Sequence, residues 1–244
     1  GDSRAAMFNN LRFTPVESDI RAGIPKVEGA LQAAALGVLS ERWSQLEQAV
    51  SGLGRASLDQ TPHADDKTVF VGPTAYNFLN VFLKPPRGLL SAGQSLSEHP
   101  LHVIRCVSRE DALAVFALLS SHLAYWWWHT HGDGFHVSRR MLATFPFGVE
   151  ALTGRSASQL TESGEELWST ICKFPIISLN RGKTSLAFTP NGNERTRRKA
   201  DETLAELAGL KKPFVEELQQ FTAHTVAATL RVRRSDTQYE SEGA

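Results

Sequence analysis

Apolar residues recur with helical spacing in several stretches of the chain. Between residues 26 and 50 they fall every three or four positions in a segment rich in Ala, Leu, Glu and Gln, which predicts an amphipathic helix. Residues 112–128 repeat the pattern behind Ser108 and Asp111, a capping-type start, and predict one long buried helix. Further helices are expected at 138–145, 160–174, 194–207 and 213–230.

Shorter runs of β-branched and aromatic residues predict strands between these helices. The expected strands lie at 68–72, 80–83, 101–107 and 176–179. The pattern predicts an α+β fold whose β-rich middle part is flanked by N-terminal and C-terminal helices. We expect three segments: a helical N-terminal segment 1–66, an α+β domain 67–190 and a C-terminal helical segment 191–244.

Composition says little about partners. The 244 residues allow one or two domains, and Lys+Arg and Asp+Glu balance at 26 each, so attraction to a polyanion must be local. No run approaches the roughly 18 apolar residues of a membrane span, and no membrane partner is expected. Cys106 and Cys172 lie in separate apolar runs, which is typical of reduced thiols in a cytoplasmic protein. The start at Gly1, with the first Met at position 7, suggests a fragment of a longer protein.

A local excess of positive charge occurs in the second half of the chain. From Lys173 to Lys199 there are seven basic residues and one acid, Glu194. Such a run suits phosphate contacts, although a solvated helix start gives the same pattern. The residues expected to contact phosphate are Lys84, Arg87, Arg139, Arg140, Arg181, Lys183, Arg195, Arg197 and Arg198. Arg195, Arg197, Arg198 and Lys199 are expected to form one patch.

Three histidines and a carboxylate lie close together in the sequence, at His129, His131, Asp133 and His136. They resemble the His-x-His-x-Asp-His signature of metallo-β-lactamase-type hydrolases, and a metal-dependent hydrolase is therefore one alternative function. Gly134 stands where that signature needs a histidine, and the string follows a helix rather than a strand. The simpler interpretation is a helix end closed by Gly132 or Gly134, with no metal ligand and no catalytic residue.

Three consecutive tryptophans at 126–128 cover most of the circumference of the predicted helix, so they cannot all face one core. At least one is expected to meet a surface, another element or a partner. Indole rings stack on unpaired bases, but more often they anchor core packing. A protein-interaction module that uses an exposed indole is the second alternative function.

Three short motifs follow one another between residues 117 and 146. Ala-Leu-Leu-Ser-Ser-His-Leu-Ala-Tyr-Trp-Trp-Trp at 117–128 is followed by Gly-Asp-Gly-Phe-His at 132–136 and by Phe-Pro at 145–146. In this order and spacing, roughly residues 67–209 resemble the C-terminal specificity region of type IIG-like restriction-modification adenine-specific DNA methyltransferases. That region is similar to the domains of type I specificity subunits. Ser120 departs from the Asn often found there.

The resemblance implies a module that recognises a double-stranded DNA sequence for a methyltransferase domain or subunit outside this chain. The domain at 67–190 would then be the target-recognition domain of a bacterial cytoplasmic enzyme. The sequence has neither a Gly-rich nucleotide loop nor the Asn/Asp-Pro-Pro-aromatic tetrapeptide that grips a target adenine. S-adenosylmethionine is therefore expected only on a separate catalytic domain.

Overall fold

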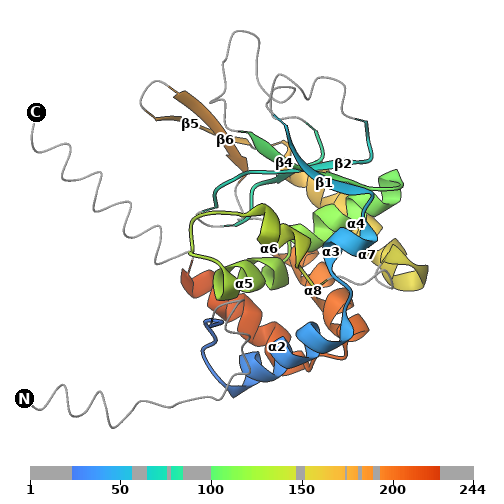
Figure 1. Ribbon diagram of the computed structural model, residues 1–244, viewed down its shortest axis with the longest axis vertical. Coiled ribbons are helices and arrows are strands. Elements are labelled where there is room, and N and C mark those ends of the chain that lie inside the picture. The colour runs from blue at the N-terminus through green and yellow to red at the C-terminus, as the bar shows by residue number, and fades with distance from the viewer. Residues whose placement is uncertain are drawn as a thin grey trace, which may run out of the picture.

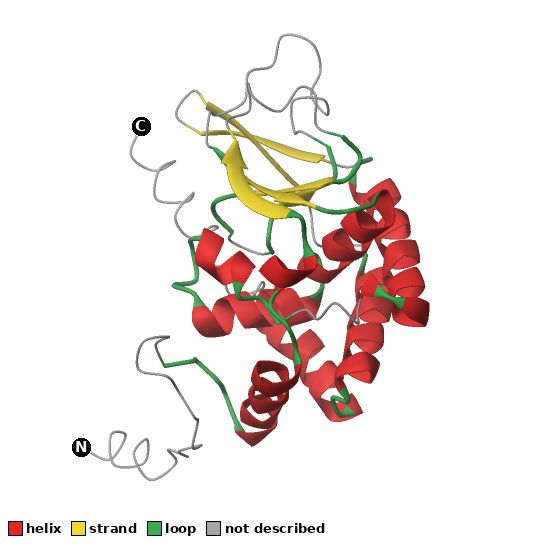
Figure 2. Cartoon of the chain, turned by 45° about the vertical axis from the view of Figure 1, so that its right-hand side comes forward, coloured by secondary structure: helices red, strands yellow, loops and turns green. Residues whose placement is uncertain are grey.

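Strands and helices gather at opposite ends of the molecule, as Figure 1 and, after rotation, Figure 2 show. The computed structural model describes residues 24–56, 65–75, 78–84, 100–146, 152–173, 175–180, 183–188 and 193–225. The predicted α+β class is confirmed. None of the described helices combines the length and the hydropathy needed to cross a membrane.

The elements largely follow the sequence pattern. The helices are α2 (Ala30–Arg42), α3 (Leu46–Ala49), α4 (Arg109–Leu119), α5 (His122–His131), α6 (Arg139–Ala143), α7 (Gly154–Ile171) and α8 (Glu194–Ala208), and residues 212–225 are also helical. The strands are β1 (Gly52–Ala56), β2 (Thr68–Val71), β3 (Val81–Phe82), β4 (Leu101–Arg105), β5 (Pro175–Asn180) and β6 (Lys183–Phe188). The middle part is less β-rich than expected, because α4, α5, α6 and α7 make up more of it than its strands do.

Four strands form an antiparallel sheet in the order β1-β4-β2-β3, and β5 and β6 form a separate hairpin. Val69, Val71 and Ile104 belong to the large core with the helices. The alternate residues form a second apolar cluster, made of Phe70, Phe82, Leu101 and Val103. This period of two is what a sheet buried on both faces requires. The strand β1 was not predicted, because Gly-Leu-Gly-Arg-Ala lacks the β-branched residues that favour strands.

The predicted single helix over 112–128 is two helices, and this corrects the expectation. The break falls at Ser120 and Ser121. The Ser121 hydroxyl accepts the backbone N–H of Ala124 at 3.0 Å, which caps the start of α5. Serine side chains compete with the backbone for hydrogen bonds, so a pair of serines favours a new helix start over continuation.

The helix α4 forms the centre of the core, and every residue from Ala112 to Leu119 is buried. It packs closely on α7 at Gly164, where a Cβ atom would lie 2.2 Å from the carbonyl oxygen of Leu113. Only glycine fits there. Residues of all three expected segments contribute to this core, from Leu36 of α2 to Phe214 of the last helix.

Candidate nucleic-acid interface

The exposed basic residues of α8 are partly neutralised by neighbouring carboxylates. Arg195, Arg198 and Lys199 are exposed, as the sequence predicted. Arg198 donates to Glu202 at 2.9 Å, and Lys199 donates to Glu166 of α7 at 3.1 Å. Exposed ion pairs of this kind contribute little stability. They do place a negative charge beside two of the cations expected to attract phosphate.

Arg197 points the other way, into the protein. Its side chain is 4% exposed, and its guanidinium carbon lies 4.2 Å from the centre of the Phe78 ring. Burial lowers the pKa of Arg197 to about 10, although the carboxylates of Glu194 and Asp201 act in the opposite direction. Arg197 lies on one helical stripe with the buried residues Asp201 and Leu204. The expectation that Arg197 contacts phosphate is therefore corrected, because its position on the inward stripe makes it part of the core.

A buried histidine connects α8 to the first turn of α5. Nδ1 of His122 donates to Oδ2 of Asp201 at 2.6 Å, and Nε2 donates to Oε2 of Glu194 at 3.2 Å. Oδ1 of Asp201 accepts the backbone N–H of Leu123 at 3.1 Å. Burial would lower the pKa of His122, but the hydrogen bonds to Asp201 and Glu194 outweigh it and raise the pKa to about 9. Sequence reasoning placed His122 only within an apolar run and missed these partners.

Lys84 lies in a mixed electrostatic setting. It is exposed and borders a cavity of about 320 Å³. Charged residues of both signs line this cavity: Arg109, Asp65, Asp66 and Glu165. Among the described residues of this lining, three carboxylates against two cations make a poor phosphate site. Of the other predicted contacts, Arg87 and Arg181 lie outside the described residues, and Lys183 begins β6 with only its backbone described.

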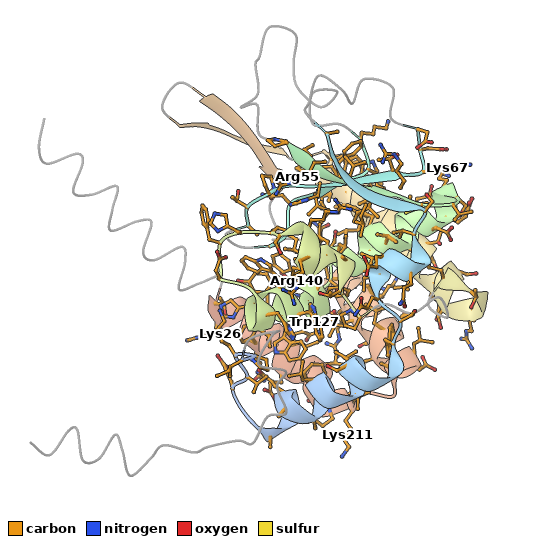
Figure 3. All side chains as sticks on the ribbon, viewed as in Figure 1. Lys26, Arg55, Lys67, Trp127, Arg140 and Lys211 are labelled. Atoms are coloured by element: carbon orange, nitrogen blue, oxygen red, sulfur yellow. The ribbon has the colours of Figure 1, made fainter. Side chains whose placement is uncertain are left out.

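Arg139 and Arg140 form the first turn of α6, which packs against the edge strand β1. Both are exposed, and so is Arg55 near the end of β1. The register of β1 and β4 places Arg55 opposite His102, so the two side chains share one face of the sheet. We call Arg55, Arg139 and Arg140 the arginine face. Figure 3 labels Arg55 at the sheet and Arg140 lower in the view, near Trp127.

The arginine face carries uncompensated charge. Within the described part of the chain, none of its three guanidinium groups forms an ion pair with a carboxylate. Burial lowers the pKa of His102, although the hydrogen bond between His102 and the Val137 carbonyl acts in the opposite direction. The positive charges of Arg55 and Arg139 lower this pKa further. Arg55 and Arg139 therefore both act on the imidazole of His102. This makes them better phosphate candidates than the paired cations of α8.

The histidine-rich string closes α5 and then forms a tight turn. Gly132 ends the helix, and a Cβ atom there would lie 2.6 Å from the carbonyl oxygen of Trp128. Gly134 has a φ of 82°, which favours glycine. Asp133 accepts two following backbone N–H groups through Oδ1, and its Oδ2 accepts from Nδ1 of His136 at 2.6 Å. The segment thus has the glycine-closed helix end that the sequence predicted.

The three histidines of the string have different surroundings. His129 packs edge-on against Phe221 with ring centres 5.2 Å apart, and His131 stacks on Trp127 at 4.0 Å. His136 holds the turn described above. In the part of the chain that the structure describes, no three His, Cys, Asp or Glu side chains gather as they would around a metal ion. The geometry gives the hydrolase alternative no support.

An open pocket of about 510 Å³ lies beside the arginine face, between α2, α5 and α6. We call it the tryptophan pocket. Its described lining includes the aromatic rings of Trp43, Trp127 and His131 and the cation Arg140. The expectation that the three consecutive tryptophans cannot all face one core is wrong, because all three are buried in the same core. Other elements pack on several sides of α5: Phe214 contacts Trp126, Phe145 contacts Trp127, and the His136 carbonyl accepts from Trp128. Trp127, which is 7% exposed, also borders this pocket.

Comparisons with protein-family models, with curated proteins and with solved structures gave no match.

Proposed function

We propose that this chain binds double-stranded DNA in a sequence-specific way, as the target-recognition module of a restriction-modification adenine DNA methyltransferase. The observation that supports the proposal most is the arginine face, three exposed arginines that make no ion pair within the described residues. The order of motifs from 117 to 146 is the second support, because it resembles the specificity regions of such enzymes.

Arginine suits this role for a geometric reason. Its planar guanidinium binds a phosphate group through two parallel hydrogen bonds and keeps its charge at any physiological pH. A chain with no net charge attracts DNA only where local charge is uncompensated. The arginine face meets that condition. In α8, by contrast, Arg198 forms an ion pair with Glu202, and Lys199 forms one with Glu166.

The reaction itself would belong to another domain or subunit. That part would bind S-adenosylmethionine and transfer the methyl group, while this chain would fix the position of the DNA. A cytoplasmic setting fits the free thiols of Cys106 and Cys172. Lys84 and Arg198 are secondary phosphate candidates, because carboxylates line the cavity beside Lys84 and Glu202 pairs with Arg198. Arg195 is a third secondary candidate.

Selection from a pool of randomised DNA duplexes tests sequence-specific binding. The chain is immobilised, bound duplexes are recovered over several rounds, and the recovered sequences are compared. The proposal predicts enrichment of one short motif. The Arg139→Gln/Arg140→Gln variant should retain less duplex of every sequence, because phosphate contacts position the DNA without reading bases. Lys211→Gln, which removes an exposed charge far from the arginine face in Figure 3, serves as control. Recovery of no duplex, or of duplexes without a shared motif, would contradict the proposal.

A further inference from the structure

We propose that the tryptophan pocket binds one unpaired nucleotide, with the base against Trp127 and the phosphate on Arg140. The inference extends the proposed function and depends on it for the DNA strand that would cross the arginine face. The nucleotide is either free or part of a strand, and the experiment below separates these two sources.

The size and walls of the pocket fit a planar ligand. Small-molecule sites commonly measure about 300–1,000 Å³ and combine aromatic walls with few polar groups. This pocket, at about 510 Å³, falls within that range. Its rings come from separate elements: Trp43 ends α2, whereas Trp127 and His131 belong to α5. Aromatic rings stack on any base, because every base has a π-face.

The hydrogen bonds of the three consecutive tryptophans set Trp127 apart. The indole N–H of Trp126 donates to Oε1 of Gln32 at 3.0 Å, and that of Trp128 donates to the His136 carbonyl at 2.9 Å. The indole N–H of Trp127 has no acceptor among the described residues, although more than nine-tenths of this side chain is buried. The Trp127 indole nitrogen is not among the fully buried side-chain atoms that lack a partner, so it is not an unsatisfied donor of the core. Trp127 borders the pocket, so a ligand with a ring nitrogen or carbonyl oxygen can supply the acceptor.

The charge of the pocket favours an anionic ligand. Among the side chains that the structure describes in its lining, Arg140 is the cation, and there is no aspartate or glutamate. Its other polar groups include the hydroxyls of Ser40 and Ser138. His131 stacks on Trp127, and burial lowers its pKa despite a hydrogen bond to the Trp127 carbonyl, so it acts as a neutral ring at neutral pH. An aromatic acceptor group joined to a phosphate, as in a nucleotide, matches every one of these features.

Nuclear magnetic resonance of the indole N–H groups tests the inference directly. The chain has five tryptophans, and the signal of Trp127 is identified by its loss in Trp127→Phe. The intact chain is titrated with AMP, with a short single-stranded oligonucleotide and with a fully paired duplex. We expect the Trp127 signal to shift with AMP or the single strand, while the signals of Trp126 and Trp128 stay in place. A shift with the strand alone identifies a nucleotide within DNA as the ligand, and a shift with both identifies the nucleotide unit itself.

Two variants separate base from phosphate recognition. Arg140→Gln should weaken AMP binding several-fold and leave the weaker binding of adenosine unchanged, because adenosine lacks the phosphate. Trp127→Phe keeps an aromatic ring and removes one hydrogen bond, so binding should weaken by about two- to tenfold. Lys211→Gln removes the same charge as Arg140→Gln at a distant surface and should bind AMP normally.

The outcomes distinguish this inference from the proposed function. If neither AMP nor the single strand moves the Trp127 signal while duplex binding still depends on the arginine face, the inference fails and the proposed function stands. If the Trp127 signal moves but no duplex binds, the pocket is a nucleotide site and the proposed function fails. Shifts of equal size in Trp126, Trp127 and Trp128 would also overturn the inference, because they indicate a general effect on the fold.

Discussion

Nδ1 of His122 lies 2.6 Å from Oδ2 of Asp201, and this buried contact joins the start of α5 to the middle of α8. The Asp201 carboxylate is fully buried, and it also accepts the backbone N–H of Leu123. A buried carboxylate is tolerated only when it is paired and hydrogen-bonded. The contact therefore fixes how α8 sits against the helix that carries Trp127.

Removal of the Asp201 carboxylate should strongly destabilise the fold. Asp201→Ala leaves a buried positive histidine without its main partner, which costs about 3–5 kcal/mol of unfolding free energy. Glu202→Ala is the matched control on the next residue, because it removes only the exposed pair with Arg198 and should cost less than about 1 kcal/mol. Denaturant unfolding followed by circular dichroism measures both. Equal effects of the two substitutions would show that the buried contact contributes nothing special.

The same contact predicts how stability depends on pH. The folded-state pKa of His122, about 9, exceeds its ordinary value of 6.5, because Asp201 and Glu194 overcome the effect of burial. The resulting stability is complete below pH 6.5 and is lost as the pH rises through 9, by about 3 kcal/mol in total. Burial lowers the pKa of Arg197, the remaining charged neighbour, to about 10, so Arg197 begins to lose charge only at the upper end of this range. Unfolding free energies of the wild type and His122→Gln between pH 6 and 9.5 should converge, and parallel curves would exclude this role for His122.

Gly164 should tolerate no side chain. A Cβ atom there would lie 2.2 Å from the Leu113 carbonyl oxygen, so Gly164→Ala must push α7 away from α4. Overpacking of this kind costs about 1–3 kcal/mol. Gly37→Ala in α2, where nothing lies within 4 Å of the added atom, should instead stabilise the protein by up to about 1 kcal/mol. Thermal unfolding of the two variants should show shifts of opposite sign, and a stabilising Gly164→Ala would contradict the packing described.

The histidine-rich string should hold no tightly bound zinc. His129, His131 and His136 each contact a different group, and a zinc site needs its ligands to converge within about 2.1 Å of one point. Elemental analysis of purified protein after dialysis measures the metal content, which we expect to be far below one equivalent. One equivalent of zinc that is lost in His131→Ala would support the hydrolase alternative instead.

The sequence predicted much of the fold because local patterns and tertiary packing agree in most elements. The helix at 194–207 and the strand at 68–72 lie close to where the spacing of apolar residues places them. The single helix expected over 112–128 is instead two helices, and local spacing does not reveal the break between them. Its break depends on hydrogen bonds of Ser121 and on a carboxylate supplied by Asp201, which lies far along the chain.

The candidate site was harder to predict than the fold. The charge run in α8 drew attention to Arg197, yet the buried residues four and seven positions later show that Arg197 lies on the inward stripe. Arg55 was missed because it is a single cation in a strand that the sequence did not predict, and only the pairing of β1 with β4 places it opposite His102. Long-range pairing of this kind leaves no mark in local sequence.

The central claim is that the arginine face binds the phosphate groups of DNA, and the salt dependence of duplex binding tests it most directly. Each phosphate contact adds about 0.9 to the slope of log affinity against log salt concentration. Arg139→Gln/Arg140→Gln should therefore weaken binding to every duplex and reduce the slope by up to about 1.8, whereas Arg195→Gln/Arg198→Gln in α8 should change it less. An unchanged slope and affinity in the Arg139→Gln/Arg140→Gln variant would contradict the claim.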